Sequence, residues 1–172
     1  EGSGGALSVT GQNSQVTITS SVIDLCSATD EGGGLYIANQ AKAIISSTNF
    51  SSNVATEGSG GALSVTGQNS QVTITSSVID SCSATDEGGG LYISNKAQAT
   101  ISSTNFSSNV ATGGNGGALS VTGQNSQVTI TSSVIDSCSA TDEGGGLYIT
   151  DQAQVTILST NFSSNVATEG SG

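Results

Sequence analysis

Acidic residues recur at one kind of turn along this chain, and they are the side chains best suited to chemistry in a sequence without histidine. Carboxylates and glycine-rich backbone carbonyls offer the oxygen ligands that Ca²⁺ prefers. We therefore predict a calcium site at this acidic corner, with a merely solvated acidic edge as the alternative. The residues concerned are Asp30, Glu31, Glu57, Asp86, Glu87, Asp142, Glu143 and Glu169.

A catalytic role for these carboxylates is not expected. Paired carboxylates hydrolyse glycosidic bonds in many glycosidases. A repeated sequence would copy the same pair into every unit, however, and this one has no arginine or histidine to hold a sugar acid. We predict that the protein is not an enzyme and has no catalytic residues or organic cofactor.

Three Asn-Phe-Ser tripeptides begin at Asn49, Asn105 and Asn161, and no other Asn-x-Ser or Asn-x-Thr sequence occurs in the chain. Such tripeptides accept N-linked glycans in secreted eukaryotic proteins. If each phenylalanine faces inward, strand alternation turns the preceding asparagine outward. We predict N-glycosylation at these three asparagines, provided that the source is a eukaryote, with chance occurrence of the tripeptide in a serine-rich sequence as the alternative.

The net charge excludes two classes of partner. The 172 residues include 13 acidic residues against two lysines, Lys42 and Lys96, so the formal net charge is −11. Such a surface repels phosphate backbones and anionic lipid headgroups, so we expect no nucleic-acid binding. No apolar run approaches the roughly 18 residues that span a bilayer, so we expect no membrane insertion in this segment.

A tandem repeat organises the whole chain. The Gly-Gly-Ala-Leu sequence that ends at Leu7 returns at Leu63 and Leu119, and further leucines stand midway, at Leu35 and Leu91, so each unit is a doublet. Neither end departs from the pattern as a capping repeat would. We expect one segment, 1–172, of a longer array, with units 1–56, 57–112 and 113–168 and the start of a fourth at 169–172.

Alternating apolar and polar residues predict short strands within each half of the repeat unit. In the first half-unit the alternation covers residues 7–9, residues 16–19 and the stretch around Ile23, with turn-forming sequences between them. Helical repeats would need apolar residues at i, i+3 and i+4 and fewer glycines. We predict an all-β fold, a parallel β-helix (β-solenoid) of about six 28-residue coils with three short strands each.

Stacking of these coils about 4.8 Å apart predicts four columns of inward apolar residues. One step between coils contains a one-residue slip that the following corner compensates. The four columns run from Leu7 to Leu147, from Val9 to Ile149, from Ile18 to Ile157 and from Ile23 to Phe162.

The three cysteines, Cys26, Cys82 and Cys138, occupy the same position in successive repeat units. Two coils separate neighbouring cysteines, about 9.6 Å, and a disulfide needs Cα atoms within about 7 Å. Without histidine they also lack the usual base of a nucleophilic thiol and a common partner ligand for a metal. We predict free cysteines that serve as small buried apolar residues, in the place that Asn53 occupies one coil on.

Two short motifs carry a resemblance to a known family. Phe-x-x-Asn occurs at residues 50–53, 106–109 and 162–165, and Gly-Gly-Ala-Leu follows at residues 60–63 and 116–119. These motifs resemble the FxxN and GGA(I/L/V) repeats of chlamydial polymorphic outer membrane proteins. The resemblance implies a right-handed β-helix exposed on the cell surface and a role in adhesion.

Three functions follow as expectations, all with an extracellular or cell-surface location. The first is the structural shaft of an extracellular filament, appendage or surface protein, whose partners are further copies of the same repeat stacked end to end. The alternative is an adhesin passenger of the autotransporter type. The second alternative is an ice-binding or glycan-binding β-solenoid, because outward threonine pairs such as Thr17 and Thr19 resemble the flat threonine arrays of ice-binding solenoids.

Overall fold

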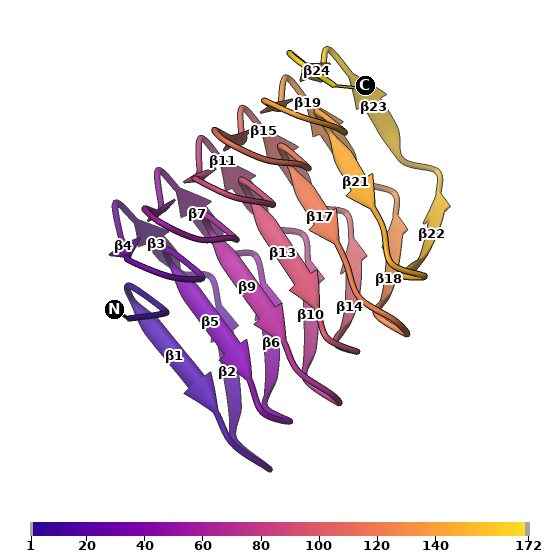
Figure 1. Ribbon diagram of the computed structural model, residues 1–172. Coiled ribbons are helices and arrows are strands. Elements are labelled where there is room, and N and C mark those ends of the chain that lie inside the picture. The colour runs from indigo at the N-terminus through magenta and orange to yellow at the C-terminus, as the bar shows by residue number, and fades with distance from the viewer. Residues whose placement is uncertain (1, 171–172) are drawn as a thin grey trace.

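The computed structural model describes residues 2–170, and within them it shows strands, turns and bends but no helix. The first predicted unit begins at residue 1 and the fourth includes residues 171 and 172, and these three residues lie outside the described part of the chain. The chain winds through six coils, and corresponding strands of successive coils form four parallel sheets of six strands (Figure 1). We number the coils from the N-terminus, so that odd coils begin each repeat unit.

The four sheets follow one another around each coil, and we name them A to D in that order. Sheet A contains β1 (Leu7–Thr10), β5 (Leu35–Ala38), β9 (Leu63–Thr66), β13 (Leu91–Ser94), β17 (Leu119–Val121) and β21 (Leu147–Ile149). Sheet B contains β2 (Gln15–Thr19), β6 (Lys42–Ser46), β10 (Gln71–Thr75), β14 (Gln98–Ser102), β18 (Gln127–Thr131) and β22 (Gln154–Leu158).

Sheets C and D are built from shorter strands. Sheet C contains β3 (Val22–Asp24), β7 (Asn49–Ser51), β11 (Val78–Asp80), β15 (Asn105–Ser107), β19 (Val134–Asp136) and β23 (Asn161–Ser163). Sheet D contains β4 (Ser27–Ala28), β8 (Val54–Ala55), β12 (Ser83–Ala84), β16 (Val110–Ala111), β20 (Ser139–Ala140) and β24 (Val166–Ala167).

The prediction of three strands per coil was wrong, because the structure has four. The additional strand of each coil is the one in sheet D. Each sheet D strand is too short to show an alternating pattern, as Ser27–Ala28 illustrates. Its inward residue is an alanine in every coil, and those in coils 1 to 5 are buried. Because alanine is small, the backbone of sheet D lies close to the core, and sheet D completes each coil without adding a large core residue.

The predicted columns are confirmed by the strand pairing. In sheet A the step from coil to coil is constant, since Leu7 pairs with Leu35 and Leu35 pairs with Leu63. In sheet B the step is alternately one residue shorter and one residue longer than the step in sheet A. Ile18 pairs with Ile45, and Ile45 pairs with Ile74. The interior leucines and isoleucines of these columns are 0% exposed, so the core is a continuous stack of like residues.

The predicted one-residue slip has a simple origin in the turns. The turn from β1 to β2 covers residues 11–14, whereas the turn from β5 to β6 covers only 39–41. The corner from sheet D to sheet A compensates for this, because it covers 29–34 between β4 and β5 and is one residue longer, 56–62, between β8 and β9. Both kinds of coil therefore return to the same leucine column, although they differ in their turns.

Tight corners between sheets B and C are made by serine in the left-handed region, for example Ser20 with φ 49° and Ser76 with φ 50°. Serine rarely adopts such a φ without local hydrogen bonding. The next residue provides it, because the hydroxyls of Ser21 and Ser77 each donate to the carbonyl two residues earlier at 2.9 Å. The high serine and threonine content thus builds corners as well as surface.

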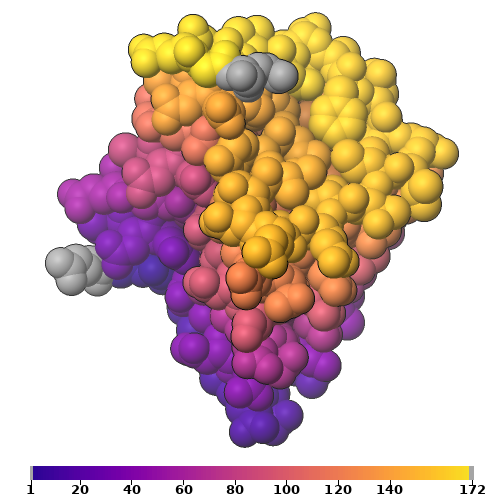
Figure 2. All heavy atoms as spheres, turned by 45° about the vertical axis from the view of Figure 1, so that its right-hand side comes forward, coloured from indigo at the N-terminus to yellow at the C-terminus, as the bar shows by residue number. Residues whose placement is uncertain are grey.

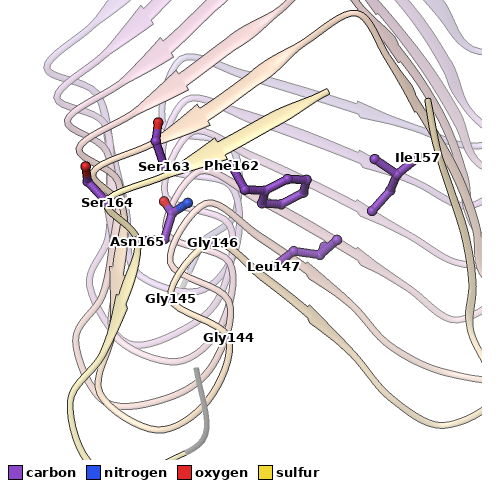
Figure 3. A pocket seen from close by; sticks show the side chains of 9 residues that line it. All are labelled: Gly144, Gly145, Gly146, Leu147, Ile157, Phe162, Ser163, Ser164 and Asn165. Atoms are coloured by element: carbon purple, nitrogen blue, oxygen red, sulfur yellow. The ribbon is translucent and has the colours of Figure 1, made fainter. Parts of the chain in front are cut away.

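The two ends of the stack lie far apart, as the colour gradient in Figures 1 and 2 shows. Coil 6 has a described coil on one side only, so its core residues are more exposed than their equivalents. Phe162 is 41% exposed, whereas Phe50 and Phe106 are fully buried. Figure 3 shows Phe162, Ile157 and Leu147 directed into the interior around the hollow at this end.

Truncation of a central core leucine tests the inward assignment. We expect Leu91→Ala to lower the free energy of unfolding by about 2–5 kcal/mol, because coils on both sides prevent collapse into the cavity. Leu91 is 0% exposed. Leu25→Ala is the control, since this side chain is 77% exposed and should change stability by less than about 0.5 kcal/mol. Chemical denaturation measures both, and equal losses would contradict the assignment.

Candidate functional site

The acidic corner lies between sheets D and A, where the Asp-Glu pairs lie on every second coil. Glu57 and Glu169 lie at the same corner of the coil that follows a pair, and their backbone N–H groups donate to the carbonyls of Thr29 and Thr141. Asp30 of coil 2 is followed by Gly58 of coil 3 and then by Asp86 of coil 4, and backbone hydrogen bonds join these coils. A Cβ on Gly58 would lie 2.2 Å from the carbonyl oxygen of Asp30, so only glycine fits there. The aspartates are therefore two coils apart, about 9.6 Å, rather than adjacent.

The glutamates of the same corner are held by serine and asparagine side chains of neighbouring coils. The backbone N–H of Glu87 donates to Ser59 Oγ at 3.2 Å, and that of Glu143 donates to Asn115 Oδ1 at 2.9 Å. The carboxylates of Glu31 and Glu87 accept hydrogen bonds from Ser64 and Ser120, at 2.8 and 2.9 Å. These glutamates thus serve as acceptors that join successive coils.

Glu31 is partly buried, and this burial raises the pKa of its carboxyl above the ordinary value of 4.5. The hydrogen bond from Ser64 lowers the pKa, and the charge of Asp30 raises it further, but burial is the largest cause. The folded protein therefore binds a proton at Glu31 more readily than the unfolded chain does.

A hollow lies beside this corner across the second and third units, and Glu87, Tyr92 and Asp142 are among the residues that line it. Gly113 takes the place that Glu57 occupies one unit earlier, which leaves the hollow open. The Tyr92 hydroxyl lies 3.3 Å from Thr122 Oγ1, and burial raises the pKa of this tyrosine above its ordinary value of 10.0. Tyr92 thus lies on the outer surface of sheet A and is half-buried there.

The predicted calcium ligands are not gathered into one cluster. Within residues 2–170, no three side chains among His, Cys, Asp and Glu lie close enough together to hold a metal ion. A Ca²⁺ ion needs several oxygen ligands at about 2.3–2.6 Å. Calcium binding at this corner stays a prediction from the sequence.

The cysteines alternate with asparagines in one column, as predicted. Cys82 and Cys138 are fully buried and free, and Cys26 in coil 1 is partly exposed. The intervening asparagine has a role that the sequence pattern did not predict. Asn53 Oδ1 accepts from the backbone N–H of Cys26 at 3.0 Å, and its Nδ2 donates to the carbonyl of Ile23 at 2.8 Å. The recurrence of Asn53 at a strand end was the signal that could have revealed this bridge.

A second feature that sequence analysis missed is a set of short hydrogen bonds on the outer side of sheet C. Ser51 donates to Asp24 Oδ1 at 2.6 Å, and Ser107 donates to Asp80 Oδ1 at 2.6 Å. The hydrogen bond from Ser163 also lowers the pKa of the Asp136 carboxyl. The seryl oxygens lie in the Asn-Phe-Ser tripeptides, so each tripeptide is joined to the coil before it.

The asparagines of these tripeptides face outward, as predicted. Asn49, Asn105 and Asn161 are exposed, whereas Phe50 and Phe106 are 0% exposed. The outer face of sheet B also matches the predicted pattern, since its strands carry threonine and serine and no carboxylate. The hydroxyls of Thr17, Thr73 and Thr100 make no side-chain hydrogen bond within residues 2–170, and exposed Ile44 interrupts the row.

Comparison with known proteins supports this architecture. The family described as the right handed beta helix region matches residues 3–172, and the chain belongs to this family. No curated protein and no solved structure matches the chain. The described residues contain no helix long and apolar enough to cross a membrane.

Removal of the Glu31 charge should stabilise the protein at neutral pH. Because the pKa of Glu31 is higher in the folded protein than in the unfolded chain, protonation of Glu31 stabilises the fold. This stabilisation is fully present below the pKa of the unfolded chain, near 4.5, and is lost as the pH rises through the pKa of the folded protein. We expect Glu31→Gln to melt above the wild type at pH 7, with the difference shrinking toward pH 4. Glu57→Gln, which removes an exposed charge of the same corner, is the control. A larger gain at pH 4 than at pH 7 would contradict this account.

Thiol labelling tests the buried column. Burial raises the pKa of the Cys82 thiol to about 11, and burial likewise raises that of Cys138. Alkylation needs the thiolate and access to it, so at pH 8 these two cysteines should stay unlabelled in the folded protein. Cys26, which is partly exposed, should react first. Mass spectrometry of the labelled peptides measures this order, and equal labelling would show that the column is open.

Proposed function

We propose that this β-helix is the non-catalytic shaft of an extracellular filament, appendage or cell-surface protein. The observation that carries the proposal is the unbroken register of the stack. Sheet A pairs leucine with leucine across all five junctions between coils. Each repeat unit of two coils thus offers the next unit the same interface, which allows a rod to be lengthened by copying one unit.

The surface chemistry supports a rod that extends along its axis. The chain carries a net charge of −11, and like-charged walls oppose side-by-side association. Coil ends instead present unpaired strand backbone and apolar columns, to which further coils of the same repeat add in register. Partners of this shaft are accordingly further copies of the repeat, in the same chain or another.

An adhesin passenger is the second candidate, and the Phe-x-x-Asn and Gly-Gly-Ala-Leu motifs favour it by their resemblance to polymorphic outer membrane proteins. Phe50 fills the core and Asn53 bridges two coils, so a β-helix of either function uses both motif positions structurally. An ice-binding or glycan-binding solenoid is the third candidate, supported by the outward threonine and serine hydroxyls of sheet B, which Lys42 and Ile44 interrupt in β6.

Length measurements on chains of different repeat number test the shaft. We expect the longest dimension from small-angle X-ray scattering to grow by about 9.6 Å for each added repeat unit, because a unit contributes two coils of about 4.8 Å. The cross-section should stay constant. A dimension that stops growing, or a cross-section that widens with repeat number, would contradict the proposal.

Activity assays separate the three candidates. A shaft should neither shape ice crystals nor bind polysaccharide, so thermal hysteresis and glycan pull-down should equal those of a buffer control. Thermal hysteresis that is lost in Thr73→Lys, a substitution at an exposed sheet B position, would favour the ice-binding candidate instead. Cell adhesion by beads coated with this segment would favour the adhesin.

A further inference from the structure

The outer face of sheet C carries a column in which asparagine and valine alternate. Asn49 pairs with Val22 on one side and with Val78 on the other, and Asn105 lies between Val78 and Val134. Val22 is 69% exposed, and Val78 and Val134 are each 38% exposed. A row of exposed apolar residues therefore lies on a wall that is otherwise polar, with asparagines at every second coil.

These asparagines have no structural explanation within the fold. Asparagine is a poor strand former, and the equivalent position of the odd coils is valine, a good one. Within residues 2–170 the side chains of Asn49, Asn105 and Asn161 make no hydrogen bond, whereas Asn53 is buried with both its amide atoms bonded. The other two members of each tripeptide are explained, since Phe50 fills the core and Ser51 binds Asp24.

We infer that Asn49, Asn105 and Asn161 are acceptor sites for N-linked oligosaccharides. Each begins the Asn-x-Ser sequence that such transfer requires, and each side chain is exposed and unbonded within the described chain. In the transfer step, Nδ2 forms a bond to the anomeric carbon of a lipid-pyrophosphate-linked oligosaccharide. The bond from that carbon to the phosphate oxygen breaks, the lipid pyrophosphate leaves, and it takes up the proton that Nδ2 loses.

The periodicity gives these glycans a further effect on the surface. They emerge from one face of the rod, two coils apart, or about 9.6 Å. Each asparagine lies directly beside the valines of the adjacent coils, about 4.8 Å away, so the first sugars attached to it lie over those valines. The valines between the asparagines are then covered, and the exposed apolar row is hidden from other rods. This inference rests on the proposed extracellular location, because glycan transfer takes place in the secretory pathway.

Translation in the presence of eukaryotic microsomes, with a secretion signal placed before the chain, tests the acceptor sites. We expect a mass increase of three glycans that a peptide N-glycosidase removes. Asn49→Gln, Asn105→Gln and Asn161→Gln should each remove one glycan, and the triple variant should carry none. An imported, protease-protected wild-type chain without added mass would overturn the inference, while leaving the scattering test of the shaft unaffected.

Substitutions at the serine separate recognition of the tripeptide from an effect on folding. Ser51→Ala should lose the first glycan and Ser51→Thr should keep it, because the hydroxyl two residues after asparagine is part of the acceptor sequence. Asp24→Ala is the matched control, since it removes the partner of Ser51 but leaves the tripeptide intact. Loss of the glycan in Asp24→Ala but not in Ser51→Ala would overturn the assignment.

Covering of the valines has its own readout. Enzymatic removal of the glycans should increase the fluorescence of an apolar dye bound to the protein. The increase should be absent in a variant with threonine at Val22, Val78 and Val134, whose wall offers the dye no apolar row. An equal increase in both proteins would show that the glycans do not lie over this column.

Discussion

Hydrogen bonding between coils, in register and along one axis, is the interaction on which the rest of this structure depends. Backbone groups of each coil bind the coils on either side, both in the four sheets and at many of the corners between them. Residues at equivalent positions must therefore stack directly on one another, about 4.8 Å apart. Any side chain that suits the repeat has to suit its own neighbours in the column, which limits what a repeated sequence can contain.

The doublet form of the repeat resolves a conflict that a stack of identical coils would create. Identical coils would stack Asp24 on aspartate and Asp30 on aspartate at about 4.8 Å, where like charges repel. In the doublet Asp24 stacks on Ser51, which donates to it at 2.6 Å, and Asp30 stacks on Gly58. The same alternation puts phenylalanine on isoleucine in the core. Odd and even coils are thus complementary rather than merely similar.

Periodicity and alternation were enough to predict the coils, the four apolar columns and the outward asparagines. The reason is that the same register repeats through the whole chain. A wrong assignment of one position as inward or outward would therefore recur in every coil and would conflict with the apolar pattern of the sequence. Sheet D was missed because a strand as short as Ser27–Ala28 carries no periodic signal. The Ser51–Asp24 and Asn53–Cys26 bonds were missed because their partners lie on different coils, and the slip of sheet B sets which residues meet.

The difference between inner and outer columns indicates where selection for function can act on such a rod. Every inward position is fixed by the residue stacked on it, as Leu91 is by Leu63 and Leu119. Serine at the corners and glycine at the acidic turn are fixed by backbone geometry. What remains free is the outer face of the sheets, where residues such as Thr100 and Asn105 have no side-chain partner within the described chain. Because the fold does not require these residues, the outer faces of sheets B and C are where residues can be selected for contacts with other molecules.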